Sequence, residues 1–127
     1  ENSNWILIYK NKKISLSFKK EKNGRIRVFQ DYQNNNLLTG WFGRQLNKYA
    51  FVKISSDNKE LNIETSIFSN KCKFINSSKN IVLKLENTEN PILSLYKSDI
   101  NSFNLSYKNI ITELESILIV SFLFICN

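Results

Sequence analysis

Basic side chains are concentrated in the first part of the chain, where they could bind an anionic group. They are Lys10, Lys12, Lys13, Lys19, Lys20, Lys22, Arg25 and Arg27. Lys and Arg bind phosphate and carboxylate groups through charge-assisted hydrogen bonds. The chemistry that this set predicts is therefore the binding of an anion, such as a lipid headgroup, a nucleic acid or an acidic protein.

The charge of the chain is uneven. The net charge is +7, and residues 1–53 carry 11 Lys and Arg against three acidic residues, whereas residues 54–127 carry seven Lys against eight acids. A basic half indicates an anionic partner. Solubility, or the protection of an edge strand by lysines, explains the same imbalance without a partner, and both explanations stay open.

The chain lacks the residues that most catalytic mechanisms need. The chain has no His and only three Gly, which excludes a Ser/His/Asp triad and the glycine-rich phosphate loops. The carboxylate pairs Glu113/Glu115 and Glu86/Glu89 are expected to be solvated surface groups or helix N-terminal acids. We therefore expect no enzyme activity, no cofactor and no metal. Two cysteines, Cys72 and Cys126, are expected to pack in the core, with a disulfide as the alternative.

The elements that must position the cations are short β-strands, because apolar and polar residues alternate with a period of two from Trp5 to Tyr107. The strongest turn signal is Asn23-Gly24, since both residues accept a positive φ. It predicts a β-hairpin over Lys13–Tyr32. The basic residues then fall at the start of its first strand (Lys12, Lys13), near its turn (Lys19, Lys20, Lys22) and in its second strand (Arg25, Arg27).

Further alternating segments extend over most of the chain. Strands are predicted at Trp5–Lys10, Leu37–Gly43, Lys48–Ser55, Glu60–Thr65, Lys71–Asn76, Asn80–Glu86, Ile92–Tyr96 and Phe103–Tyr107. Short polar turns between them favour an antiparallel meander. The expected fold class is mainly β: one domain over residues 1–127, closing into a barrel of about 10 to 12 short strands around a hydrophobic C-terminal helix.

The final segment, Ile110–Cys126, departs from the alternation. From Ile117 to Cys126 it contains one polar residue and no charge. A helix that is apolar all round is a core helix or a membrane span, and this run is shorter than the roughly 20 residues that a span needs. We expect a core helix with Leu118, Phe122 and Ile125 buried. Its β-branched residues leave a long strand open, and a truncated membrane anchor is the third alternative.

The end of the chain resembles the tubby-like superfamily, which includes plant LURP-one-related proteins and phospholipid scramblases. Asn80–Glu86 and Pro91–Lys97 look like the last paired strands of that fold, and Ser102–Tyr107 looks like the segment before its central helix. Ile110–Cys126 is similar to the helix itself. Family members are usually longer, and their helix often has Ala or Gly where this chain has Ile, Leu and Phe. The resemblance implies a closed barrel around the helix and phosphoinositide binding or a scramblase-like role.

Three functional hypotheses follow. The first is a non-catalytic module, intracellular and peripheral to a membrane, that binds anionic lipid headgroups. The second is a nucleic-acid or ribonucleoprotein component, and the third is a lipocalin-like barrel that holds a small apolar ligand and keeps the final segment outside. The chain has no Met, so we expect either a removed leader or a fragment. The oligomeric state is left open.

The first prediction concerns deletion of Ser116–Asn127. Burying one large apolar side chain contributes about 1.5–3 kcal/mol, against roughly 5–15 kcal/mol for a whole domain. If the segment is core, the truncated chain should be unfolded or aggregated. A membrane anchor predicts the opposite, a more soluble domain that keeps its β signal. Circular dichroism with a melting curve separates the two, and a cooperative β transition near that of the full chain would rule out the core helix.

Overall fold

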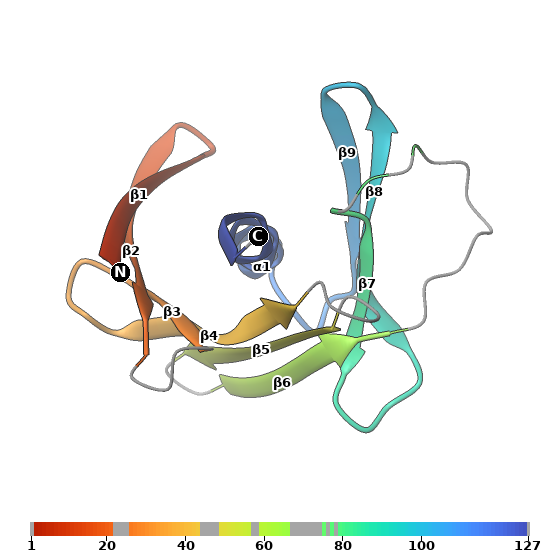
Figure 1. Ribbon diagram of the computed structural model, residues 1–127, viewed down its shortest axis with the longest axis horizontal. Helices are drawn as coiled ribbons and strands as arrows, with labels where there is room; N and C mark the ends of the chain where they lie inside the picture. The colour runs from red at the N-terminus through yellow and green to blue at the C-terminus, as the bar shows by residue number, and fades with distance from the viewer. Residues whose placement is uncertain are drawn as a thin grey trace.

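The described residues form an antiparallel β-meander that is followed by a helix (Figure 1). The computed structural model describes residues 2–21, 26–43, 49–56, 59–66, 75, 77 and 79–126. The strands are β1 (Asn2–Tyr9), β2 (Lys12–Lys20), β3 (Arg27–Gln30), β4 (Asn36–Gly43), β5 (Tyr49–Ser56), β6 (Lys59–Thr65), β7 (Ile81–Leu85), β8 (Pro91–Asp99) and β9 (Ser102–Tyr107), and the helix is α1 (Glu113–Cys126). Each strand pairs with the next in the chain.

This architecture confirms the predicted mainly β meander with a C-terminal helix. The described residues form nine strands, fewer than expected, and their hydrogen bonds do not close a barrel, because β1 and β9 lie at opposite ends of the sheet. Most of the strand predicted at Lys71–Asn76 lies outside the described residues. Within it, Ile75 forms an isolated bridge to Lys97 of β8.

The hairpin predicted over Lys13–Tyr32 has the expected strand pairing, with Lys20 opposite Arg27 and Phe18 opposite Phe29. Its Asn23-Gly24 turn lies outside the described residues. A tighter hairpin precedes it and was not predicted. Lys10 and Asn11 have φ values of 48° and 64° and join β1 to β2 in a two-residue turn, as type I′ geometry requires.

One face of the sheet carries the apolar core. Side chains opposite each other in the register, such as Phe18 with Phe29 and Val52 with Ile63, point to this face because the side-chain period of a strand is two. The buried strand residues of this core are Leu16, Phe29, Leu38, Val52, Ile54, Ile63, Ile81, Leu83, Ile92, Leu93 and Leu95. The alternation seen in the sequence therefore corresponds to a real division between an inner and an outer face.

The helix α1 covers this inner face. In Figure 1 the β1–β2 and β8–β9 hairpins stand on either side of the helix and the middle strands run beneath it. Phe122 has no exposed surface and meets Phe18 and Phe29 edge to face, with ring centroids 5.8 and 5.4 Å apart. Phe124 meets Phe103 of β9 in the same way at 5.4 Å. The helix thus contacts both ends of the sheet.

The core-helix prediction is confirmed, and the long-strand alternative is wrong. Leu118 and Phe122 are buried as expected, whereas Ile125 is only half-buried. The β-branched residues of α1 adopt a helical conformation because packing against the sheet outweighs their helix-propensity cost of a few tenths of a kcal/mol each. No helix in the described part of the chain is both long and apolar enough to cross a membrane.

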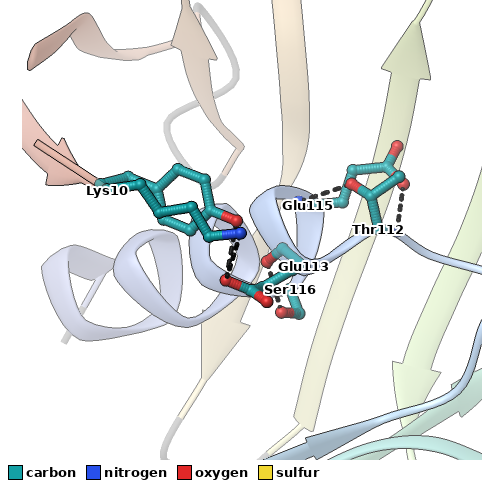
Figure 2. Close-up of polar contacts among 6 residues, drawn as sticks. Lys10, Thr112, Glu113, Glu115 and Ser116 are labelled. Carbon is teal, nitrogen blue, oxygen red and sulfur yellow. Dashed lines mark hydrogen bonds and ion pairs between the residues drawn. The ribbon is translucent and has the colours of Figure 1, made fainter. Parts of the chain in front are cut away.

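The helix begins at Glu113, later than the predicted Ile110, because Thr112 caps it. The Glu115 backbone N–H donates to Thr112 Oγ1 at 3.1 Å, and the Thr112 N–H donates to Glu115 Oε1 at 2.8 Å (Figure 2). This reciprocal pair is a capping box, and its Thr-x-x-Glu pattern is visible in the sequence. Glu113 and Glu115 lie in the first turn, as helix N-terminal acids were expected to do.

The helix–sheet contact predicts a large stability difference between two phenylalanines. Phe122→Ala should lower the free energy of unfolding by about 3–5 kcal/mol, because it empties a closed aromatic cluster. Phe124→Ala is the matched control and should cost about 1–2 kcal/mol, since the residue is 37% exposed. Urea unfolding followed by circular dichroism measures both. Equal losses would contradict the packing described here.

Candidate functional site

The β1–β2 hairpin, residues 2–20, is the most strongly charged part of the described chain, and we call it the basic hairpin. It contains Lys10, Lys12, Lys13, Lys19 and Lys20 and no acidic residue. A β-hairpin holds these side chains on a rigid two-stranded ribbon rather than on a loop. The backbone positions of Lys12, Lys13, Lys19 and Lys20 relative to one another are therefore fixed by the strand pairing.

The cations do not form one cluster. Lys12 and Lys13 begin β2, and Lys19 and Lys20 end it. Lys13 and Lys19 are six residues apart on one strand, which places their Cα atoms about 20 Å from each other. The structure therefore separates the predicted set into two groups at opposite ends of the basic hairpin, too far apart for one phosphate to bridge.

The alternation along the strands also assigns faces. Leu16 is buried in the core, so residues of the opposite parity in β2, including Lys13 and Lys19, point to the outer face. Their neighbours on β1 are Ile8, opposite Lys13, and Ile6, opposite Ser15. Ile6 and Ile8 are 65% and 69% exposed. We call this surface the outer hairpin face: it has two exposed isoleucines beside Lys13 at one end and Lys19 opposite Asn2 at the other.

Lys10 has a role inside the protein. The Tyr9 hydroxyl donates a hydrogen bond to Glu113 Oε1 at 2.7 Å, and Lys10 Nζ lies 3.7 Å from the same oxygen (Figure 2). This contact ties the turn of the basic hairpin to the first turn of α1. The hydrogen bond to Glu113 raises the pKa of Tyr9, and the hydrogen bond to Tyr9 raises the pKa of Lys10. No local signal could have paired positions more than 100 residues apart.

Arg27 also faces the fold. It is half-buried, lies opposite Lys20 and makes contacts within the protein. Its charge acts on the Cys126 thiol, but burial is the stronger influence and raises the pKa of that thiol to about 12. Cys126 is a free, partly buried thiol, whereas Cys72 lies outside the described residues. Lys22 and Arg25 also lie outside them.

A buried amide was missed by the sequence reasoning. Asn80 is 4% exposed, and its Nδ2 donates to the Ile75 carbonyl at 2.9 Å while its Oδ1 accepts from the Lys97 N–H at 2.7 Å. Both ends of the side chain are thus used to hold the segment before β7 against β8. The role of Asn80 is structural, because each polar atom has a partner within the protein.

Comparisons with known proteins add no further residues to this site. Neither protein-family models, nor curated protein sequences, nor solved structures give a match to this chain. The function is therefore argued from the geometry of the basic hairpin: two groups of lysines, an exposed pair of isoleucines and an anchor to the helix.

The hydrogen bond between Tyr9 and Glu113 predicts that the protein loses stability at alkaline pH. Because the pKa of Tyr9 is raised in the folded state, its stabilising effect is complete below the unfolded-state pKa and is lost as the pH rises through the folded-state value. Tyr9→Phe should reduce the fall in melting temperature above about pH 10, where an unperturbed tyrosine ionises.

Tyr32→Phe is the matched control, because Tyr32 is 80% exposed and lies away from α1 in the β3–β4 connection. Melting curves of both variants across this pH range, with tyrosinate absorbance recorded in parallel, measure the effect. An equal loss of stability at alkaline pH in Tyr9→Phe, in Tyr32→Phe and in the unmodified chain would refute the role of the contact between Tyr9 and Glu113.

Proposed function

We propose that this chain is a non-catalytic binding module whose outer hairpin face associates with anionic phospholipid surfaces. The outer hairpin face carries the proposal, because exposed Ile8 lies opposite Lys13, exposed Ile6 lies next to it on the same face, and the ribbon has no acidic residue. Lysines near an anionic membrane contribute about 1 kcal/mol each, and apolar side chains add to this by entering the headgroup region.

The spacing of the lysines supports an extended anionic surface. Lys13 and Lys19 are about 20 Å apart, which is longer than any single headgroup or free phosphate. A membrane presents many headgroups at once, so both ends of the ribbon can be neutralised together.

Nucleic acid is the weaker candidate on the same surface. Proteins that hold single strands stack bases on aromatic rings, and those that hold duplexes line a groove with Lys and Arg. The exposed apolar residues of the outer hairpin face are Ile6 and Ile8, which lack a ring. Arg27, the best phosphate-binding side chain of the predicted set, faces the helix instead.

A lipocalin-like role is disfavoured by the position of α1. That hypothesis needs the final segment outside an open interior. Ile119 and Phe122 are instead fully buried against the inner face of the sheet, so the helix fills the place that a small ligand would take.

The proposed architecture is tubby-like: a sheet that curls into a barrel around α1. Support for the curl comes from contacts of the helix with β2 and β3 at one end and with β9 at the other. Among the described residues, the β1 and β9 edges do not pair with each other. We place the protein inside the cell, peripheral to a membrane, and a scramblase-like activity is a further possibility that this resemblance implies.

Co-sedimentation with vesicles tests the proposal. The chain should pellet with phosphatidylcholine vesicles that contain phosphatidylserine or a phosphoinositide, and not with phosphatidylcholine alone. Lys13→Glu should weaken the partition coefficient about tenfold, because it replaces an attraction by a repulsion. Ile6→Ser should weaken it as well by removing apolar area.

Lys108→Glu is the matched control, since Lys108 is an exposed lysine that follows β9, far along the sheet from the basic hairpin. It makes the same change in net charge and should leave binding nearly unchanged. Equal binding to neutral vesicles, or an equal loss in the Lys13 and Lys108 variants, is incompatible with the proposed surface. Binding to RNA that exceeds binding to anionic vesicles at the same salt would favour the second hypothesis.

A further inference from the structure

Strand β1 is an edge of the sheet that is open to pairing. Among the described residues it pairs only with β2, through an unbroken register from Asn2 opposite Lys19 to Tyr9 opposite Lys12. A strand at the edge of a sheet presents a row of backbone N–H and C=O groups to any extended chain that reaches it. This edge uses main-chain groups, whereas the proposed lipid surface uses side chains.

The register identifies which groups point outward. In a two-residue hairpin the residues on either side of the turn, here Tyr9 and Lys12, exchange both N–H···O bonds. Bonded and non-bonded residues then alternate along an antiparallel strand. The N–H and C=O of Asn4, Ile6 and Ile8 therefore point away from β2, toward the open edge.

Natural edge strands are usually protected, and β1 lacks the usual devices. It contains no charged residue and no Pro, and its register with β2 shows no bulge. It is also apolar on both faces, with Trp5 44% exposed on the inner side and Ile6 and Ile8 on the outer side. At the other end of the sheet, β9 alternates instead, with exposed Ser102, Asn104, and Ser106.

The positive charge around the β1 edge favours one kind of partner. Lysines lie at both ends of the basic hairpin, Lys12 and Lys13 at one end and Lys19 and Lys20 at the other, with no acidic residue between them. A second copy that pairs through its own β1 would bring its β2 lysines to three strand spacings from these, roughly 14 Å, and like charges at that distance repel at low salt. A chain with acidic residues would be attracted at the same positions.

We propose that β1 binds an extended segment of a partner protein by strand addition, and that this segment has apolar residues in its middle and Asp or Glu at both ends. The main-chain groups of Asn4, Ile6 and Ile8 hold its backbone. Trp5, Ile6 and Ile8 contact its apolar residues, and the lysines of β2 lie one strand further, about 10 Å away, within reach of long acidic side chains.

The probe is a synthetic peptide with alternating Val and Thr in its middle and two Glu at each end, acetylated and amidated at its termini. Calorimetric titration into the full chain should show binding that weakens as salt is added. A peptide with Lys in place of Glu should bind at least about tenfold more weakly, because each attraction becomes a repulsion. In hydrogen exchange, the amides of Asn4, Ile6 and Ile8 should become protected only when the acidic peptide is bound.

A proline variant tests the edge itself. Ile6→Pro removes an N–H that points away from β2, so the β1–β2 bonds can remain, and it should weaken peptide binding about tenfold through lost main-chain bonds. Ile6→Thr keeps the N–H and is the matched control, with a smaller loss. Should the proline variant fail to fold, an acidic peptide N-methylated at alternate residues makes the same test on the unmodified chain and should not bind.

Each other outcome overturns the inference. Equal affinity for the acidic and basic peptides removes the charge argument, and binding that survives N-methylation removes the strand-addition geometry. Protection of Ile6 and Ile8 amides that rises with protein concentration alone would show pairing between copies. Absence of binding at low salt would show that β1 does not bind an acidic extended segment. Loss of binding by the N-methylated peptide does not bear on vesicle binding, because that test leaves every side chain of the outer hairpin face in place.

Discussion

Burying α1 is the constraint on which the rest of the structure depends. The helix is apolar on nearly every side, so one flat layer of strands would leave much of it in water. The sheet therefore bends until β2 and β3 reach Phe122 from one side and β9 reaches Phe124 from the other. The one buried hydroxyl in this region, on Ser116, donates to the Glu113 carbonyl at 2.6 Å, so the helix brings no unsatisfied polar side chain into the core.

The first turn of α1 also fixes the position of the basic hairpin, which carries the candidate surface. The capping box between Thr112 and Glu115 sets where α1 begins and leaves the Glu113 carboxylate free to accept from Tyr9. That hydrogen bond holds the turn of the basic hairpin against the helix. The inner side of the ribbon is thereby committed to the fold, and the outer side with Ile6, Ile8 and Lys13 is left to face a partner.

The basic hairpin then offers two surfaces of different chemistry. Its outer face presents side chains, lysines and isoleucines, that suit a charged and partly apolar layer. Its β1 edge presents main-chain groups, which suit another strand. A membrane and an extended acidic segment would meet different atoms of the same ribbon, and the lysines of β2 would favour either one through their charge. This is why charge reversal alone cannot separate the two, whereas the N-methylated peptide can.

Local pattern determined the strands, because a period of two marks a half-buried strand wherever it occurs; β2, β4, β6, β8 and β9 all fall where alternation predicts them. It also indicated the apolar C-terminal helix, whose length and composition leave few places except a core. Tertiary structure alone decided that Tyr9 meets Glu113 and that Arg27 faces the helix. These depend on contacts between distant positions and on the direction of each strand face, and no local spacing encodes either one.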